Sequence, residues 1–254
     1  MDRTLRIINL VFFILMILVN ALGEYMPLGV GSTGEISAKY PNLFTPAPIT
    51  FSIWGLIYLM VAIFIFYQMG WGASNAYTTE LVSTISFWFV VSCIMNIGWM
   101  ISWHYDMIIF SLVYMIGLLL TLIIITSRFQ QLSDPPMLAK VSGIGFYIYL
   151  GWICAATIAN VSVLLVKANW NRFGLSEQTW TMIVIIVGTA LGILFIATKR
   201  NYFSAIAIIW AYCGILIKHI SQSGYSGKYP LIIAVTIVGI VLILTTGVVK
   251  MIQK

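Results

Sequence analysis

Eight apolar segments make up most of this chain, and each is close to the roughly 20 residues that a helix needs to cross a bilayer. Hydrophobic residues account for 61% of the chain and charged residues for only 8%, as expected where the solvent is lipid. The apolar runs show no alternation with a period of two, which favours helices over barrel strands. The sequence therefore predicts an all-α integral membrane protein, a polytopic bundle of about eight transmembrane helices. The predicted spans are residues 6–22, 49–69, 81–103, 106–127, 140–166, 179–198, 202–223 and 231–252.

The basic residues indicate the orientation and exclude one class of partner. The net charge is +6, but lysines and arginines are scattered among connections and helix ends, so nucleic acid is not an expected partner. Basic residues are enriched on the cytoplasmic side of membrane proteins. With the N-terminus inside, the inner side holds Arg3, Arg6, Arg128, Lys140, Lys199, Arg200, Lys250 and Lys254, and the outer side holds Lys39, Lys167, Arg172, Lys218 and Lys228. This excess predicts that both termini are cytoplasmic in a bacterial-type cytoplasmic membrane.

The longest connection runs from Gly23 to Pro48. Its glycines and prolines predict an irregular conformation and not a regular helix. Leu28, Leu43 and Phe44 are unusually apolar for a connection in water. Long connections of this kind often cover a binding site. The segment is therefore either a lid over such a site or a packed cap on the end of the bundle.

Three predicted spans each place a tryptophan on one helical face with further aromatic, amide or small residues. An asparagine in hydrocarbon is costly unless it is hydrogen-bonded, so both in-span asparagines should face inward. The pattern indicates either a pocket with flat aromatic walls for a planar apolar ligand, or ordinary packing with tryptophans at the interfaces and asparagines joining helices. The candidate ligand-binding residues are Trp54, Tyr58, Asn96, Trp99, Trp103, Trp152, Ala156 and Asn160.

These residues form short motifs in a fixed order. Trp54 and Tyr58 make W-x-x-x-Y, Asn96 and Trp99 make N-x-x-W, and residues 152–160 make W-x-x-x-A-x-x-x-N. Together with the sequence Phe-Thr-Pro-Ala-Pro at 44–48, they resemble the tryptophan-rich sensory protein, or translocator protein, family over residues 1–170. Ser52 stands where the family often has proline, and the chain continues beyond the family's five helices. The chain therefore resembles an extended, eight-helix branch.

The resemblance implies a domain organisation and a ligand. Residues 1–170 would form a five-helix membrane core, and residues 171–254 a C-terminal three-helix membrane extension of the same continuous membrane domain. The family resemblance implies binding of tetrapyrroles or other flat hydrophobic molecules in a pocket capped by the first connection. It also implies a homodimer and, as in some members, light-dependent porphyrin chemistry. A bound porphyrin is thus an expected ligand, while no cofactor is required.

A basic residue near the end of span 202–223 offers a second candidate site. Lys218 shares a helical face with Trp210, Gly214 and Gln222, which would direct its ammonium group into the bundle. There it could meet Tyr225, loop carbonyls or an anionic ligand, because an intramembrane charge needs partners. The alternative is a lysine that reaches to the headgroups, with His219 beside it at the surface. Lys218 and Trp210 are therefore the candidate polar or ionic site.

Other polar and small residues favour structural roles. Cys93, Cys154 and Cys213 lie within apolar spans without metal-ligand spacing, which indicates packing thiols. A pair of glycines at 188 and 192 allows close helix approach, for internal packing or for a dimer contact. The turn at 104–106 is expected to be solvated, although its histidine and aspartate could exchange a proton. The β-branched run at 232–243 is expected to face lipid.

The sequence contains no recognisable catalytic constellation. Paired carboxylates within a span, nucleophile motifs and phosphate-binding loops are absent, so no catalytic or metal-ligating residue is assigned. The favoured function is a membrane protein that binds a planar hydrophobic small molecule, of the tetrapyrrole or porphyrin type, as a sensor or ligand handler. A multi-pass small-molecule transporter is the alternative, and light-dependent chemistry on a bound porphyrin is a third hypothesis.

Overall fold

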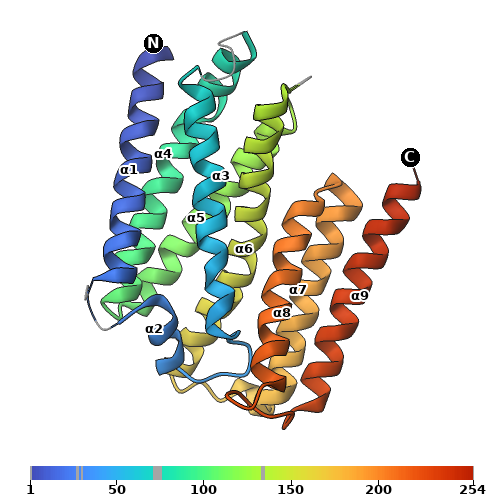
Figure 1. Cartoon of the computed structure of the whole chain (residues 1–254). Coiled ribbons are helices and arrows are strands. Elements are labelled where there is room, and N and C mark those ends of the chain that lie inside the picture. Colours follow the sequence, from blue (N-terminus) through green and yellow to red (C-terminus); the bar gives the residue numbers. More distant parts are fainter. Residues whose placement is uncertain (1, 27–28, 30, 71–75, 133–134, 254) are drawn as a thin grey trace. The chain divides into compact units, whose positions relative to one another are not determined.

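The computed structural model describes residues 2–26, 29, 31–70, 76–132 and 135–253 (Figure 1). Lys254 of the charge count and Leu28 of the first connection lie outside the described residues. The described residues form nine α-helices and two short 3-10 helices, with no strand among them. The all-α prediction is therefore confirmed.

Eight of the helices are long and apolar enough to cross a membrane. Span Pro48–Gln68 combines a 3-10 turn, η1 (Pro48–Ser52), with the helix that follows it. Two helices, of 29 and 31 residues, exceed the roughly 20 residues of a typical span, so they extend past the hydrocarbon or tilt within it. The long helices are α1 (Asp2–Tyr25), α3 (Ile53–Gln68), α4 (Ala76–His104), α5 (Ile108–Phe129), α6 (Met137–Lys167), α7 (Glu177–Lys199), α8 (Tyr202–Ile220) and α9 (Pro230–Ile252).

The connection from Gly23 to Pro48 is not irregular throughout, which corrects the prediction. It contains a seven-residue helix, α2 (Thr33–Lys39). The Glu35 carboxylate accepts a hydrogen bond from the Ser32 backbone N–H at 2.8 Å, and the Glu35 N–H donates back to the Ser32 hydroxyl oxygen at 3.4 Å. This reciprocal arrangement is a capping box, which satisfies backbone groups that a helix start leaves unpaired. The Ser-x-x-Glu spacing at 32–35 was its signal in the sequence.

The chain divides into two compact units. The first unit comprises Met1–Ile36 and Ile53–Leu150, and the second comprises Ser37–Ser52 and Gly151–Lys254. The boundary passes through α6, whose residues 137–150 belong to the first unit and 151–167 to the second. The sequence-based division at residue 170 stays a prediction about the family core and its extension.

In the first unit, α4 packs against α1 and α5, and α1 also packs against α3. Buried amides join these helices. The Asn9 side-chain amide donates to Gln68 Oε1 at 2.8 Å and to Ser86 Oγ at 2.9 Å, which links α1, α3 and α4. Further along, the rings of Phe64 and Phe89 lie 5.2 Å apart between centroids. Buried amide bonds and aromatic contacts therefore hold this unit together.

In the second unit, α7 packs against α8 and α9. A methyl group at Gly188 would meet the Tyr212 hydroxyl oxygen at 2.6 Å, and one at Gly192 would meet Ile243 at 2.7 Å. The absence of side chains at these two positions thus allows α8 and α9 to approach α7. Of the two uses predicted for this glycine pair, internal packing is the one that the structure shows.

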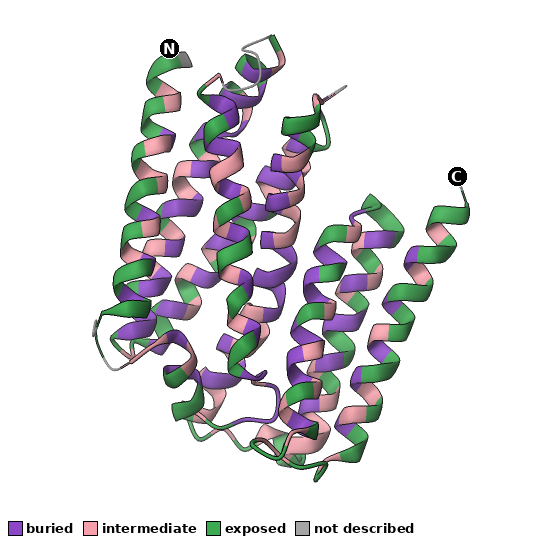
Figure 2. Ribbon diagram, in the orientation of Figure 1, coloured by how far each residue is buried: buried purple, intermediate pink, exposed green. Residues whose placement is uncertain are grey.

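Apolar side chains dominate the exposed surface of the long helices, and Figure 2 shows exposed residues along the length of each one. On α9, Val238, Val241 and Leu242 are exposed, whereas Ile232 and Ile243 are buried in the core of the second unit. The predicted lipid-facing run is therefore correct for one side of α9 only. Apolar surface of this extent on eight spans is compatible with lipid as the solvent, and the chain is an integral membrane protein.

The three cysteines are free. Cys93 and Cys154 are buried and Cys213 is half-buried, which confirms their interpretation as packing thiols. Among the described residues, no group of three His, Cys, Asp or Glu side chains could hold a metal ion.

Candidate ligand-binding site

Four aromatic side chains of the first unit form a stack, which we call the aromatic column. Trp54 and Tyr58, one turn apart on α3, lie 5.5 Å apart between ring centroids with 24° between their planes. Trp54 also stacks on Trp99 of α4 at 5.4 Å and 29°. Trp99 in turn stacks on Trp103 at 6.2 Å and 25°. The 54–58 and 96–103 faces predicted from the sequence therefore do meet.

A hydrogen-bonded amide pair lies beside the aromatic column. The Asn20 side-chain amide of α1 donates to Asn96 Oδ1 of α4 at 2.6 Å. The Tyr58 hydroxyl donates to Asn20 Oδ1 at 2.6 Å, and the Asn96 amide donates to the Tyr149 hydroxyl oxygen of α6 at 2.8 Å. Four helices thus meet at one polar network in an otherwise apolar interior. Such a network fixes the helix positions because each unpaired amide would be costly in hydrocarbon.

The aromatic column is buried at one end and accessible at the other. Trp99 and Trp103 are each 4% exposed, while Trp54 and Tyr58 are half-buried. Trp103 Nε1 donates to the Thr33 carbonyl oxygen at 3.3 Å. Trp99 Nε1 is buried and has no hydrogen-bond partner within the described ranges. A buried donor without an acceptor is uncommon and costs free energy, so an acceptor on a ligand would stabilise it.

Tyr149 and Asn20 were not predicted as site residues, although the sequence contains a feature that could have identified each of them. Asn20 lies in an apolar span, and the argument that directed Asn96 inward applies equally to it. Tyr149 precedes Trp152 by three residues on the same helix, so it shares that side of α6. Its ring meets Trp54 edge to face at 5.8 Å between centroids.

The other three candidate residues lie on α6 in the second unit. Trp152 is 3% exposed, and its ring meets Phe51 edge to face at 6.1 Å between centroids. Asn160 is 2% exposed and Ala156 is half-buried. The structure therefore brings together five of the eight candidates in the first unit. The inclusion of the remaining three in the same site stays a prediction.

The candidate polar site on α8 is occupied by other parts of the second unit. Trp210 Nε1 donates to the Thr50 carbonyl oxygen of η1 at 2.8 Å. The Thr50 side chain also packs directly against Gly214, where no side chain could fit. Lys218 is half-buried, with its Nζ 5.9 Å from the centroid of the Tyr225 ring. A ligand role for Lys218 and Trp210 stays a prediction.

Both histidines are buried, and this corrects two expectations. His219, placed at the surface in the alternative reading of Lys218, is 0% exposed, and its Nε2 lies 2.9 Å from the Leu43 carbonyl oxygen. His104, expected in a solvated turn, is 1% exposed, and its Nδ1 lies 2.9 Å from the Met100 carbonyl oxygen. Asp106, at the same turn, adopts a left-handed backbone with φ of 58°. The local sequence around the two histidines did not indicate that the ends of α4 and α8 are buried.

Fold and site define a class: a polytopic helical membrane protein with a buried tryptophan cluster. The sequence profile of the TSPO-like protein family matches residues 6–249, and the chain belongs to this family. The match extends through the three C-terminal spans, which the short motifs did not cover. No curated protein and no solved structure matches the chain.

Proposed function

We propose that this protein binds a planar hydrophobic small molecule of the tetrapyrrole type at the aromatic column, as a sensor or ligand handler within the membrane. Membership of the TSPO-like family supports the class of protein. The observation that carries the ligand is the stacking of Trp54, Trp99 and Trp103, backed by the buried Asn20–Asn96 pair. Indole planes inclined by 29° and 25° to one another offer a nearly flat surface, and a flat aromatic ligand gains both apolar burial and ring stacking on it.

The geometry also supports an entry side. Trp54 and Tyr58 are half-buried, so part of their surface remains for a ligand ring, whereas Trp99 is closed in behind them. The unsatisfied Trp99 N–H provides one donor for a nitrogen or carbonyl acceptor on the ligand. Small-molecule sites usually combine apolar walls with a few oriented polar groups, and the column together with this donor has that composition.

A fluorescence titration tests the proposal. Protoporphyrin IX is added to the full-length protein in lipid nanodiscs, and quenching of tryptophan emission is followed. We expect saturable quenching in the wild type and an affinity about tenfold lower for Trp54→Leu, because a stacking surface is lost. Trp99→Phe keeps an aromatic ring and removes only the N–H donor, so its affinity should fall less than that of Trp54→Leu.

The matched control is Trp88→Leu. Trp88 lies on α4 outside the column, with the Arg128 guanidinium carbon 5.6 Å from its ring centroid. We expect wild-type affinity for this variant. Absence of saturable quenching in the wild type, or equal affinities for Trp54→Leu and Trp88→Leu, would overturn the proposal.

The alternative functions give different readouts with the same ligand. Transport predicts that porphyrin accumulates in proteoliposomes and that Trp54→Leu slows the uptake. Light-dependent chemistry predicts bleaching of the bound porphyrin under illumination.

Two further experiments address assembly and orientation. Cross-linking in the membrane tests the homodimer that the family resemblance implies. Reporter fusions at both ends test the cytoplasmic location of the termini.

A further inference from the structure

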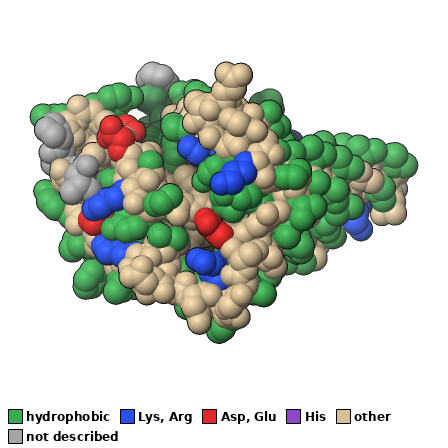
Figure 3. Space-filling view, turned by 90° about the horizontal axis from the view of Figure 1, so that it is seen from below, with side chains coloured by type: hydrophobic (Ala, Val, Ile, Leu, Met, Phe, Trp, Pro, Cys, Tyr) green, Lys and Arg blue, Asp and Glu red, His purple; other side chains and the backbone are tan. Residues whose placement is uncertain are grey.

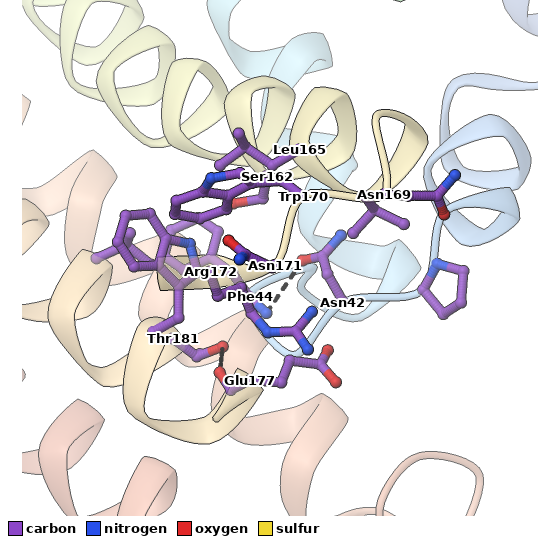
Figure 4. Close-up of a pocket in the computed structure, with 14 residues that line it drawn as sticks. Asn42, Phe44, Ser162, Leu165, Asn169, Trp170, Asn171, Arg172, Glu177 and Thr181 are labelled. Carbon is purple, nitrogen blue, oxygen red and sulfur yellow. Dashed lines mark hydrogen bonds between the residues drawn. The ribbon is translucent and has the colours of Figure 1, made fainter. Parts of the chain in front are cut away.

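The second unit contains a cavity of about 360 Å³ that is separate from the aromatic column (Figure 4). Its walls come from the segment that follows α2, the end of α6, the loop at 168–176 and the start of α7. The volume is at the lower end of the range for small-molecule pockets. Among the residues that line it are Asn42, Phe44, Trp170, Arg172, Glu177 and Trp180.

Two opposite charges face this cavity (Figure 4). Glu177 Oε1 accepts a hydrogen bond from the Leu43 backbone N–H at 3.1 Å, which leaves its second oxygen for another donor. Arg172 Nε donates to the Leu175 carbonyl oxygen at 3.3 Å, which leaves its two terminal nitrogens for an acceptor. Backbone groups therefore orient both side chains, and each retains hydrogen-bonding capacity.

Aromatic rings form the apolar part of the wall. The rings of Trp170 and Trp180 lie 4.8 Å apart between centroids at 75°, and Phe44 lines the same cavity. The faces of aromatic rings attract ammonium groups, and indole does so most strongly. A carboxylate together with two indoles is thus a favourable environment for a cation.

The loop that carries Arg172 has an unusual backbone. Arg172 and Phe173 both have positive φ, of 56° and 54°, although neither is glycine. The Asn171 side chain accepts a hydrogen bond from the Phe173 N–H at 3.1 Å, which stabilises this turn. Backbone in such sparsely populated regions concentrates at ligand-binding sites. Arg172 lines the cavity from this turn.

We propose that this cavity binds a small zwitterion, with the anionic group on Arg172 and the ammonium group between Glu177 and the two tryptophans. A guanidinium group matches the oxygens of a carboxylate or phosphate in a bidentate manner. The cavity lies where α6 ends and α7 begins, so it is at the membrane boundary. Figure 3 shows basic and acidic side chains on the end of the molecule that bears these connections. Two sources share this chemistry, a free zwitterion and the headgroup of a zwitterionic phospholipid.

Calorimetry with phosphoethanolamine tests the site, using the full-length protein in nanodiscs of phosphatidylglycerol. Ethanolamine and inorganic phosphate serve as probes that each carry one half of the ligand. We expect phosphoethanolamine to bind at least about tenfold more tightly than either half, because two charged contacts form together. Arg172→Gln should weaken phosphoethanolamine and phosphate but not ethanolamine. Glu177→Gln should weaken phosphoethanolamine and ethanolamine but not phosphate.

Controls separate binding from folding. Arg200→Gln removes a guanidinium at the opposite end of α7 and should leave all affinities unchanged. Glu177→Gln keeps an oxygen acceptor for the Leu43 N–H, and Arg172→Lys keeps the positive charge and should retain part of the phosphate affinity. Gel filtration shows whether each variant is folded.

Native mass spectrometry then distinguishes the two sources. Selective retention of phosphatidylethanolamine over phosphatidylglycerol, lost in Glu177→Gln, would identify a lipid headgroup. Binding of phosphoethanolamine without lipid retention would identify a free zwitterion. The proposal is wrong if the wild type binds neither phosphoethanolamine nor phosphatidylethanolamine. It is also wrong if both Arg172→Gln and Glu177→Gln bind phosphoethanolamine with wild-type affinity.

Discussion

The helices of the two units are held together by different contacts. In the first unit, buried side-chain amides of Asn9, Asn20 and Asn96 join helices, and aromatic rings fill the space between them. In the second unit, glycines allow close approach: the Ser204 backbone packs against Gly151, and the Tyr212 side chain packs against Gly188. Within the second unit, residues 41–50, from the end of the first connection and the start of η1, form hydrogen bonds with α7 and α8.

The type of helix contact in each unit is related to the candidate site that the unit contains. Helices in a bilayer gain little from apolar burial, so their association depends on close packing and on interhelical hydrogen bonds. The first unit relies on side-chain bonds and rings, which leave a flat aromatic surface as a candidate site. The second unit relies on close contact at glycines, and its cavity is lined by the ends of α6 and α7 together with the adjoining connections.

The largest expected effect is on the close contact at Gly151. A methyl group there would collide with the Ser204 backbone, so Gly151→Ala should force α6 and α8 apart. We expect a loss of about 2–3 kcal/mol in the free energy of unfolding, measured by denaturation in mixed micelles. Gly55→Ala is the control, because nothing lies within 4 Å of that position. Equal stabilities of the two variants would contradict close packing in the second unit.

The second-largest expected effect is on the Asn20–Asn96 amide pair of the first unit. Asn96→Leu removes the bonds to Asn20 and Tyr149. We expect a loss of about 1–2 kcal/mol, since interhelical hydrogen bonds in membranes are individually modest. Thr236→Val in the second unit is the control, because this buried hydroxyl bonds only to the Ile232 carbonyl oxygen of its own helix. If Thr236→Val costs as much in the same denaturation assay, the contrast between the units fails.

Much of the fold could be predicted because the bilayer imposes it. The eight spans followed from hydropathy alone, since only helices satisfy their backbone in lipid. Helix starts were less accurate: α4 begins at Ala76 and not at residue 81, because a helix can continue through polar residues outside the hydrocarbon.

The site was only partly predictable, for a physical reason. Helical spacing placed Trp54 with Tyr58 and Asn96 with Trp99, because such faces are local properties of the sequence. The pairing of Asn96 with Asn20 joins residues 76 positions apart, and no local pattern specifies it. The same holds for Leu43, whose backbone bonds to α7 and α8 place part of the first connection in the second unit.

A smaller effect is expected where η1 meets α8. Trp210→Phe removes the 2.8 Å hydrogen bond to the Thr50 carbonyl oxygen but keeps a ring. We expect a loss of about 1 kcal/mol and faster proteolysis within residues 41–50. Trp88→Phe, in the first unit, should change neither. Unchanged proteolysis of Trp210→Phe would show that the other hydrogen bonds alone hold the segment.

The smallest expected effect links the cavity to the loop after α8. Burial, followed by the negative charge of Glu177 and the neighbouring Tyr229, raises the pKa of Tyr225 above its ordinary value. Because folding favours the neutral phenol, this group stabilises the protein below the ordinary tyrosine pKa, and the contribution is lost as the pH rises toward the folded-state pKa. Glu177→Gln should lower the pKa of Tyr225, yet leave it raised, because burial is the larger cause. The difference in ultraviolet titration between proteins with and without Tyr225→Phe isolates this residue among the 13 tyrosines. An identical pKa in both backgrounds would show that the Glu177 charge does not reach Tyr225 and that burial raises the pKa of this group without it.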